Sequence, residues 1–370
     1  MESENIEFTT KQIDKGLSVL KSKYPSISEC VIINIDSNSS DNTKLIFQKV
    51  KTEFFKKSIN ITSLPGKGKN IIAFFKEIIK KDFDVALTLD ADLKSIKPNW
   101  VIKFLKPFIV GKCDFVTPVY ERSRFEGSTT NHFAYPLVYS FLGRDVRQPI
   151  AGDFAFSKGL VKYILKQKQT QNIRKYGIDI FETIHALKYS KNIHKVKLDR
   201  KIHNPSFSKL EPMFPQVASS ALDVIRSLDV EKLPACEKQS TSIGITDKIE
   251  FPHKDQANKL LSRQKKILLR DNLRHRWLGE VKKEIINNIN NKNFYYSKEI
   301  WSDVLSDWII YVKRKKSKSS TVLANELLPY SVFRTVHFWN KIVNYSRGEV
   351  EKEIREQAKM VRERINNKLK

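Results

Sequence analysis

The order of hydrophobic and polar positions alternates between two patterns in the N-terminal part of the chain. Apolar residues recur at helical spacing over 12–23, 41–55 and 69–80. Short runs rich in β-branched residues, at 30–35 and 84–89, separate these segments and are typical of buried strands. Strands that alternate with amphipathic helices predict an α/β fold, with a parallel sheet and helices on its faces.

Further segments continue this alternation toward residue 200. The pattern predicts strands at 115–120 and 193–198, and helices near 132–142, 157–166 and 179–189. No internal repeat interrupts the series.

The pattern changes after residue 230. Residues 231–254 contain Pro234, Pro252 and several Ser and Thr, which predicts a linker. Residues 255–370 are helical in pattern and rich in Lys, Asn and Glu, with aromatic residues at spacings typical of core packing. We therefore predict an α/β domain over 1–230, a linker, and an all-α C-terminal region.

Composition narrows the class of protein. The chain has 370 residues, 40% of them hydrophobic and 11% aromatic, which is enough for a large core. Its apolar runs are shorter than the roughly 18 residues of a membrane span, and the charged N-terminal segment has no secretory pattern. Three cysteines without CxxC spacing argue against a disulfide framework or a cysteine zinc site. We expect a cytoplasmic protein whose metal ligands, if any, are oxygen and imidazole.

The net charge of +26 raises the question of an anionic partner. The excess is spread over both halves of the chain as scattered Lys, whereas a nucleic-acid binder usually concentrates charge and interleaves aromatic residues. Nucleic acid is therefore not expected as a partner. Two basic runs, 263–276 and 313–318, remain candidates for peripheral contact with an anionic membrane.

Polar residues follow the first predicted strand. Asp36 ends that strand, and Asp41 is placed to cap the next helix. Because ligands of open parallel sheets bind at the carboxyl ends of strands, Asp36 is a candidate site residue. A plain capping turn explains the same pattern equally well.

A glycine-rich turn, PGKG at 65–68, opens the helix at 69–80. It combines flexible backbone donors, a helix N-terminus and the mobile cation of Lys67, which would suit a phosphate. The turn lacks the spacing of a Walker loop, so it is weak evidence by itself.

Two carboxylates, Asp90 and Asp92, flank one small residue directly after the buried strand at 84–89. Neighbouring like charges are costly unless a divalent cation or solvent offsets the repulsion. The pattern indicates a metal-diphosphate site, and a solvated acidic turn is the alternative.

The PGKG turn and the Asp90–Asp92 pair are followed along the chain by five further motifs. They are VYER at 119–122, GSTTN at 127–131, VRQPIAGDFA at 146–155, YGIDI at 176–180 and KIH at 201–203. The series resembles the glucosylglycerate and mannosylglycerate synthase group of GT-A glycosyltransferases, over about residues 10–228 and more faintly over 338–369. The resemblance implies a Rossmann-like, nucleotide-sugar-binding fold. It also implies a retaining enzyme that transfers a hexose from a GDP- or UDP-sugar to glycerate or a similar small acceptor.

The resemblance assigns the donor side of the site. It implies that Asp90, Asp92 and His203 hold a divalent cation, Mg²⁺ or Mn²⁺, on the diphosphate, where the cation would act as a Lewis acid. Lys67 and Asp90 would meet the donor, and Asp36 would face its base or ribose.

The acceptor side and the reacting centre follow from the same resemblance. Arg122, Gly127, Thr129 and Thr130 would bind the glycerate carboxylate, because a guanidinium fork and hydroxyl or backbone donors suit that group. The related glucosyl-3-phosphoglycerate synthases have an arginine where Ser128 stands, which favours a non-phosphorylated acceptor.

Two carboxylates complete the predicted site. Asp179 would orient the donor hexose, although its place at a helix start also fits a cap, and Asp153 would line the same cavity. No residue stands out as a covalent nucleophile, so retention would rest on front-face attack.

The chain departs from the family pattern at its start. The family begins with a strand and a polar turn, whereas residues 1–10 are short and charged, so we expect the first strand to be missing. The strand at 30–35 would then present an apolar edge, which predicts self-association as a homo-oligomer unless residues 6–9 cover the edge. Ser37 and Asn38 replace usual glycines, which predicts weaker nucleotide binding.

Two other functions stay open. One is a family-2-like transferase that acts on a lipid or polysaccharide at a membrane surface, with the basic C-terminal part as its docking face. The other is a non-catalytic relative that binds a sugar nucleotide or a partner without turnover.

Overall fold

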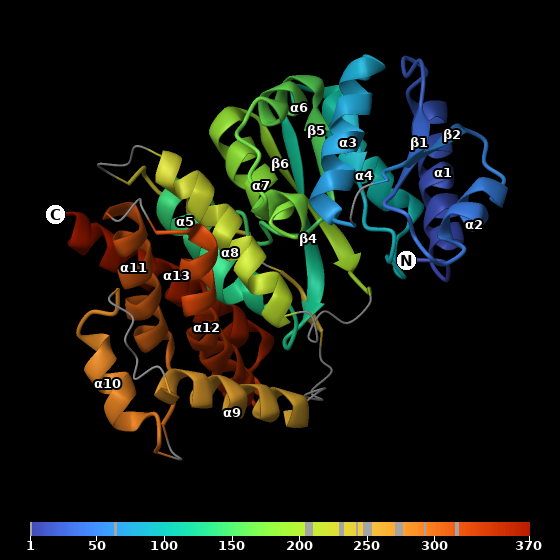
Figure 1. The fold of residues 1–370 in the computed structure, drawn as a ribbon. Coiled ribbons are helices and arrows are strands. Elements are labelled where there is room, and N and C mark those ends of the chain that lie inside the picture. The colour runs from blue at the N-terminus through green and yellow to red at the C-terminus, as the bar shows by residue number, and fades with distance from the viewer. Residues whose placement is uncertain are drawn as a thin grey trace. The chain divides into compact units, whose positions relative to one another are not determined.

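The structure is a computed structural model, and it divides the chain into two compact units (Figure 1). Unit 1 comprises Met1–Tyr120 and Ile150–Ser208, and unit 2 comprises Glu121–Pro149 and Lys209–Lys370. The residues that it describes are 2–62, 65–203, 210–228, 233–241, 243–246, 254–270, 277–291, 294–314 and 318–370. The division differs from the predicted boundary at residue 230, because residues 121–149 pack with the C-terminal helices.

The first part of unit 1 contains two strands and two helices. They are α1 (Ile6–Lys23), β1 (Val31–Asp36), α2 (Thr43–Lys49) and β2 (Phe55–Asn60). The predicted helix at 41–55 is wrong in its second half, since the helix ends at Lys49 and β2 begins at Phe55. The sequence FKKSIN of β2 hid this strand, because its side chains are only partly buried and mostly polar. β2 pairs with β1 in parallel.

The second part of unit 1 is built around the main sheet. It contains α3 (Lys67–Lys80), β3 (Val85–Thr88), α4 (Pro98–Val110), β4 (Phe115–Ser123, which ends in unit 2), β5 (Phe154–Ser157), α6 (Lys158–Leu165), α7 (Ile178–Tyr189) and β6 (Ile193–Arg200). The strand order is β3-β5-β4-β6, and β5 is antiparallel to both neighbours. The sheet is therefore mixed rather than parallel. The predicted α/β class is confirmed, whereas α4 and the four-residue β5 were missed.

Helices connect the two sheets of unit 1. Within the described residues, β1 pairs with β2 alone and β3 with β5 alone. α3 packs against both β1 and β3, and α4 packs against α1 and β3 (Figure 1). Residues 6–9 do not cover the edge of β1 as a strand, because they form the first turns of α1, where Ile6 joins the core.

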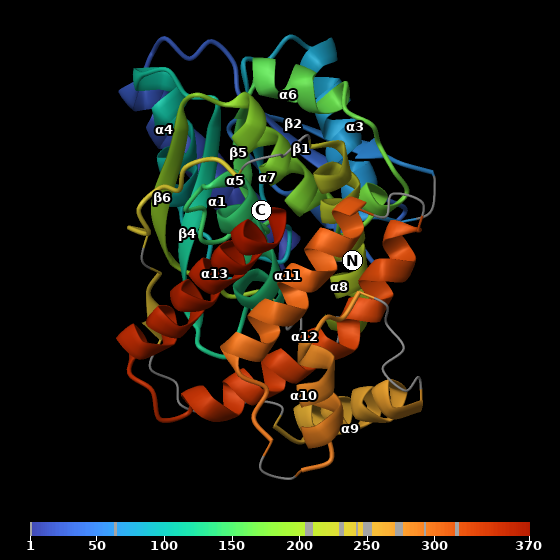
Figure 2. The same cartoon turned by 90° about the vertical axis from the view of Figure 1, so that its left-hand side faces the viewer.

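Unit 2 is predominantly helical, as predicted for the C-terminal region. Its elements are α5 (Tyr135–Leu142), α8 (Leu210–Ser227), β7 (Ile245–Thr246), α9 (Lys254–Arg270), α10 (Val281–Asn288), α11 (Lys298–Arg314), α12 (Ser320–Ile342) and α13 (Arg347–Leu369). α13 packs against α5 and α11, and α12 packs against α8 (Figure 2). Trp301 and Trp308 are fully buried on α11, so the aromatic residues form core, as expected.

The predicted linker, 231–254, lies partly outside the described residues. Its described part is tied into unit 2, because the backbone N–H groups of Ser240 and Thr241 each donate to Asp145 Oδ2 at 2.8 Å. β7 then pairs in parallel with the end of β4. These bonds make the segment part of the unit 2 structure.

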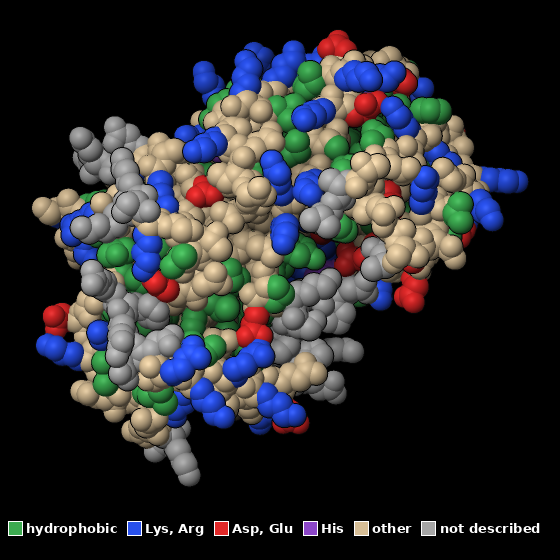
Figure 3. Space-filling view, in the orientation of Figure 1, with side chains coloured by type: hydrophobic (Ala, Val, Ile, Leu, Met, Phe, Trp, Pro, Cys, Tyr) green, Lys and Arg blue, Asp and Glu red, His purple; other side chains and the backbone are tan. Residues whose placement is uncertain are grey.

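Lys and Arg side chains are scattered over the visible face of each unit, with fewer acidic ones among them (Figure 3). Residues 263–270 of the first basic run lie on α9, and 271–276 fall outside the described residues. In the second run, Lys313 donates to the carbonyl of Leu228 and Lys318 pairs with Glu326, so both serve internal contacts. In the part of the chain that the structure describes, no helix combines the length and apolar character needed to cross a membrane.

Candidate functional site

Asp90 is the centre of a group of charged side chains in unit 1. It lies in the turn that follows β3, and its backbone N–H donates to Asp153 Oδ1 at 2.8 Å. Its carboxylate lies between two ammonium groups, with Oδ1 at 2.9 Å from Lys67 Nζ and Oδ2 at 3.0 Å from Lys201 Nζ. Although burial alone would raise its pKa, these cations hold the pKa of Asp90 far below its ordinary value. Asp90 is thus ionised.

Lys201 holds the inner side of this group. It follows β6 and is 3% exposed, with Nζ donating to Asp153 Oδ2 at 2.5 Å and to the carbonyl of Ala151 at 2.8 Å. Tyr120 also donates to Asp153 Oδ2, at 2.8 Å. All described bonds of Asp153 hold neighbouring groups in place, so this predicted catalytic carboxylate has the contacts of a positioning residue.

The glycine-rich turn is shaped by close packing at the start of α3. A Cβ at Gly68 would lie 1.7 Å from the carbonyl oxygen of Ile173, and one at Gly66 would lie 2.3 Å from that of Arg174. Gly68 N–H donates to the carbonyl of Lys175 at 3.1 Å. The glycines are therefore required by a neighbouring backbone, and one N–H of the helix start is already used.

Lys67 is the residue of this turn that reaches the charged group. Its Nζ lies 3.1 Å from Asp179 Oδ2 as well as 2.9 Å from Asp90, and its side chain keeps 22% exposure. Burial lowers its pKa, but the carboxylates of Asp179 and Asp90 outweigh this and hold the pKa of Lys67 well above its ordinary value. Lys67 is a fixed cation at the accessible side of the group.

Gly152 makes room for these ion pairs. Its φ is +86°, a region that side chains disfavour. A Cβ there would lie 2.5 Å from Asp90 Oδ2 and 2.7 Å from Lys67 Nζ. The glycine is thus needed both for its backbone angle and for the approach of the two charged groups.

Asp179 and Glu182 lie one helical turn apart at the start of α7. Burial raises the pKa of Asp179, although Lys67 opposes this effect. Burial, together with the nearby charge of Asp179, raises the pKa of Glu182 well above its ordinary value. Within the described residues, Asp179 Oδ1 and Glu182 Oε1 have no hydrogen-bond partner. They are the polar atoms of the group that are left for a ligand.

Asp36 ends β1, as predicted, and its side chain bonds within its own turn, whereas its backbone bonds to the segment that follows β2. Oδ1 accepts the backbone N–H of Ser39 at 2.8 Å, and its carbonyl accepts that of Ile61 at 2.8 Å. The predicted cap at Asp41 is wrong, because the N-cap of α2 is Asn42 and makes no side-chain cap bond, while Asp41 Oδ1 accepts the N–H of Thr43 at 3.2 Å. A contact of Asp36 with a base or ribose stays a prediction.

The predicted metal ligands lie on two neighbouring loops. The Lys94 N–H donates to the carbonyl of Ile202 at 2.8 Å, which joins the loop of Asp90 and Asp92 to that of His203. Among the described residues, no group of three or more His, Cys, Asp or Glu is arranged to hold a metal ion. Both Asp90 oxygens contact ammonium groups, so a cation bound by Asp90 would have to replace at least one of these contacts. The metal set stays a prediction.

The predicted acceptor residues lie together in unit 2. Gly127 has a φ of +70°, and its carbonyl accepts the N–H of Asn131 at 2.7 Å, which closes the turn that carries Thr129 and Thr130. Thr129 is 3% exposed, and its Oγ1 has no partner within the described residues. Arg122 begins the same region, and its backbone N–H donates to the carbonyl of Gly244 at 2.8 Å.

A buried network supports this turn from the C-terminal helices. Gln357 Nε2 donates to the carbonyl of Asn131 at 3.1 Å, and its Oε1 accepts from Arg334 Nε at 2.7 Å. Arg334 also pairs with Glu353 at 3.3 Å, and His132 Nδ1 lies 3.2 Å from Gln357 Oε1. The helical region of unit 2 is therefore part of the structure that fixes the turn.

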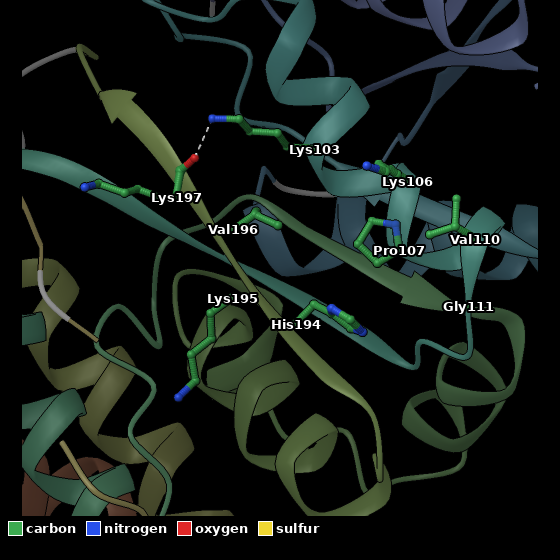
Figure 4. Close-up of a pocket in the computed structure, with 9 residues that line it drawn as sticks. All are labelled: Lys103, Lys106, Pro107, Val110, Gly111, His194, Lys195, Val196 and Lys197. Atoms are coloured by element: carbon green, nitrogen blue, oxygen red, sulfur yellow. Dashed lines mark hydrogen bonds between the residues drawn. The ribbon is translucent and has the colours of Figure 1, made fainter. Parts of the chain in front are cut away.

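A basic pocket lies elsewhere in unit 1, between α4 and β6. It has a volume of about 520 Å³. Lys103 on α4 points toward β6, where its Nζ donates to the carbonyl of Lys197 at 2.7 Å (Figure 4). None of the predicted site residues lines it. Its lining is Lys103, Lys106, Pro107, Val110, Gly111, His194, Lys195, Val196 and Lys197.

The structure brings four of the predicted site residues together. Lys67, Asp90, Asp153 and Asp179, far apart in the sequence, form one charged group. Lys201 and Glu182 were not identified as site residues, although Lys201 stood within the KIH motif. The group combines an accessible cation, an ionised carboxylate and two carboxyl groups of raised pKa, which suits a ligand with both phosphate and hydroxyl groups.

Comparison with known proteins finds similar solved structures. No family model matches the chain, and neither does any curated protein. A mycobacterial protein is 21% identical, with a TM-score of 0.48 over 60% of this chain and 71% of that one. Glucosyl-3-phosphoglycerate synthase from Mycobacterium tuberculosis, in complex with Mn²⁺, UDP-glucose and phosphoglyceric acid, is 22% identical, with a TM-score of 0.47 over 60% and 75%. The structure of the same enzyme in complex with Mg²⁺ and UDP is 21% identical, with a TM-score of 0.47 over 60% of this chain and 75% of that one.

Proposed function

We propose that the protein is a hexosyltransferase that takes a hexose from a nucleotide diphosphate sugar. The observation that carries the proposal is the position of Lys67, an accessible cation at the start of α3 that pairs with both Asp90 and Asp179. A diphosphate that meets Lys67 can replace part of this pairing with a charge-assisted hydrogen bond. The motif series that resembles GT-A synthases supports the same conclusion.

The residues of the charged group have separate roles in this proposal. Lys67 stabilises the negative charge that develops on the departing nucleoside diphosphate, since a preformed cation acts where charge appears. Lys201 and Asp153 position Asp90, and Asp179 orients the hexose. Asp36 faces the base or ribose. No covalent nucleophile is assigned, so the proposal includes retention through front-face attack.

The acceptor is proposed to be glycerate or a similar small carboxylate. Arg122 offers a guanidinium, and the turn with Gly127, Thr129 and Thr130 offers backbone and hydroxyl donors. The unpartnered Oγ1 of buried Thr129 supports this assignment, because buried polar atoms normally have a partner.

A divalent cation, Mg²⁺ or Mn²⁺, on Asp90, Asp92 and His203 remains a separate part of the proposal, and no role above depends on it. When bound, it would supply Lewis-acid stabilisation of the diphosphate. Donor binding measured with Mn²⁺ and then with a chelator separates the two contributions.

We expect Lys67→Met to weaken binding of the nucleotide diphosphate sugar by roughly ten- to a hundredfold, the usual size of a lost charge-assisted bond. Calorimetric titration with UDP- and GDP-sugars measures the change. Lys76→Met is the matched control, because Lys76 is an exposed residue of the same helix. Equal affinity in the Lys67 variant would refute its role.

A mass-spectrometric screen of the same donors with glycerate, 3-phosphoglycerate and free sugars then identifies the product. Donor binding without turnover would support the non-catalytic alternative.

The basic pocket between α4 and β6 favours the second candidate, a transferase that works at an anionic membrane surface. Lysine side chains and the exposed Val110 lie together there, a combination that suits anionic lipid headgroups. This candidate predicts salt-reversible co-sedimentation with phosphatidylglycerol vesicles and its loss in Lys106→Glu. Absence of sedimentation at low salt would exclude it.

A further inference from the structure

Glu182 is a buried carboxyl group that the proposed roles do not use. It is 1% exposed on α7, and its Oε1 has no hydrogen-bond partner within the described residues. Leaving a buried polar atom unpaired costs stability, so such an atom in a folded protein calls for an explanation. An apolar side chain would fill the same helical position without this cost.

The neighbours of Glu182 belong to the charged group. Asp179 lies one turn earlier on α7, and its Oδ1 is also buried and unpartnered, while its Oδ2 is bound to Lys67. The charges of Asp179, Lys67 and Asp90 all affect the pKa of Glu182, which burial raises most strongly. Two carboxyl oxygens in need of a partner therefore occur on successive turns of one helix.

The chemistry of this pair limits its ligand. A second anion is disfavoured, because Asp179 and Glu182 would repel it. A cation held by several carboxylates is not supported, since the described residues contain no such group. A neutral ligand with several hydroxyl groups fits, because each hydroxyl both donates and accepts and can satisfy a carboxyl group in either protonation state.

We propose that Glu182, together with Asp179, binds hydroxyl groups of the donor hexose and so selects which sugar the protein accepts. This inference rests on the proposed function and extends it, since Glu182 has no place in the motif series. A site built to bond a hydroxyl rejects an analogue that lacks it, because its buried polar groups are then left unpaired. Glu182 would discriminate among hexoses that carry the same nucleotide.

The test compares two variants against ligands with and without the sugar. Glu182→Leu should weaken binding of UDP-glucose or GDP-mannose, whichever wild type prefers, by roughly ten- to a hundredfold, the size of a lost hydrogen bond to a buried group. Binding of UDP or GDP alone should stay unchanged. Glu182→Gln keeps the shape and one donor and acceptor, so it should retain sugar-nucleotide affinity within about threefold.

A thermal measurement separates this role from a structural one. Because Glu182→Leu removes an unpaired buried carboxyl group, its Tm should rise by about 2–4 °C. Thr117→Val is the matched control, since Thr117 on β4 is 1% exposed with an unpartnered Oγ1. That variant should gain stability and keep full sugar-nucleotide affinity.

The outcomes distinguish this inference from the function on which it rests. If wild type binds neither UDP- nor GDP-sugars, the proposed function fails and the inference fails with it. If wild type binds a sugar nucleotide and Glu182→Leu binds it equally well, the inference alone is overturned. Equal loss of nucleotide and sugar-nucleotide affinity, or a lower Tm in both Glu182 variants, would also overturn it, because either shows that Glu182 supports the fold.

Discussion

Replacing Lys201 by methionine is expected to lower the free energy of unfolding by about 3–5 kcal/mol, the usual cost of removing one partner from a buried ion pair. Lys201 is 3% exposed and bonds to Asp90, to Asp153 and to a backbone carbonyl. Without it, the carboxyl group of Asp153, which is fully buried, loses the ammonium group that contacts its Oδ2. Urea unfolding followed by circular dichroism measures the loss.

Lys197→Met provides the control for Lys201→Met. Lys197 is an exposed lysine of β6, so its replacement should change the free energy of unfolding by less than about 0.5 kcal/mol. A double variant, Lys201→Met with Asp153→Asn, should recover part of the loss, because the buried carboxyl group that lost its ammonium partner is then replaced by a neutral amide. A Lys201 variant as stable as Lys197→Met would show that the buried pairs contribute nothing net.

Replacing Arg334 by methionine should lower the free energy of unfolding by a similar amount, about 3–5 kcal/mol. Arg334 is fully buried on α12, where it bonds to Gln357 and pairs with Glu353. Methionine fills similar space but cannot donate the hydrogen bond that Arg334 Nε makes to Gln357 Oε1. Gln357 Nε2 in turn donates to the carbonyl of Asn131. The expected result therefore includes weaker support of the turn at 127–131.

Arg144→Met is the comparison for Arg334→Met. Arg144 pairs with Glu237 at 2.7 Å, but both side chains are more than a third exposed, so the pair should contribute at most about 1 kcal/mol. Urea unfolding of the two variants, with proteolysis at the turn as a local readout, measures both effects. Similar stability of the two would contradict the importance of the buried network.

The sequence predicted best those helices and strands whose apolar pattern is complete within the element itself. The helices α3 and α7 and the strands β3, β4 and β6 match the predicted segments closely, because their apolar residues follow helix or strand spacing. β2 and β5 did not follow these patterns. β2 is polar and partly exposed, and β5 is too short for alternation to be visible. The antiparallel direction of β5 depends on contacts between distant segments, which local spacing does not encode.

Some residues of the candidate site could be predicted from the sequence, and others could not. Lys67 and Asp90 were found because they stand at a helix start and a strand end, positions that the sequence marks, whereas Asp179 was assigned through the family resemblance. Lys201 and Glu182 were missed because their significance comes from burial and from partners far along the chain. A lysine or a glutamate in a Lys- and Glu-rich sequence carries no local sign that it will be buried.

The two sheets of unit 1 are separate, so one of them can unfold locally without the other. In the described structure, no ladder of backbone hydrogen bonds joins the β1–β2 layer to the main sheet, and packing of α1, α3 and α4 connects them. Two layers that are held together by side-chain packing alone separate at a lower free energy than strands joined by backbone hydrogen bonds. The β1–β2 layer can therefore unfold as its own cooperative unit, which amide hydrogen exchange would detect. Asp36 belongs to that layer, whereas Asp90 belongs to the main sheet. If Asp36 and Asp90 contact the donor as proposed, motion of the layer changes the distance between these two contacts.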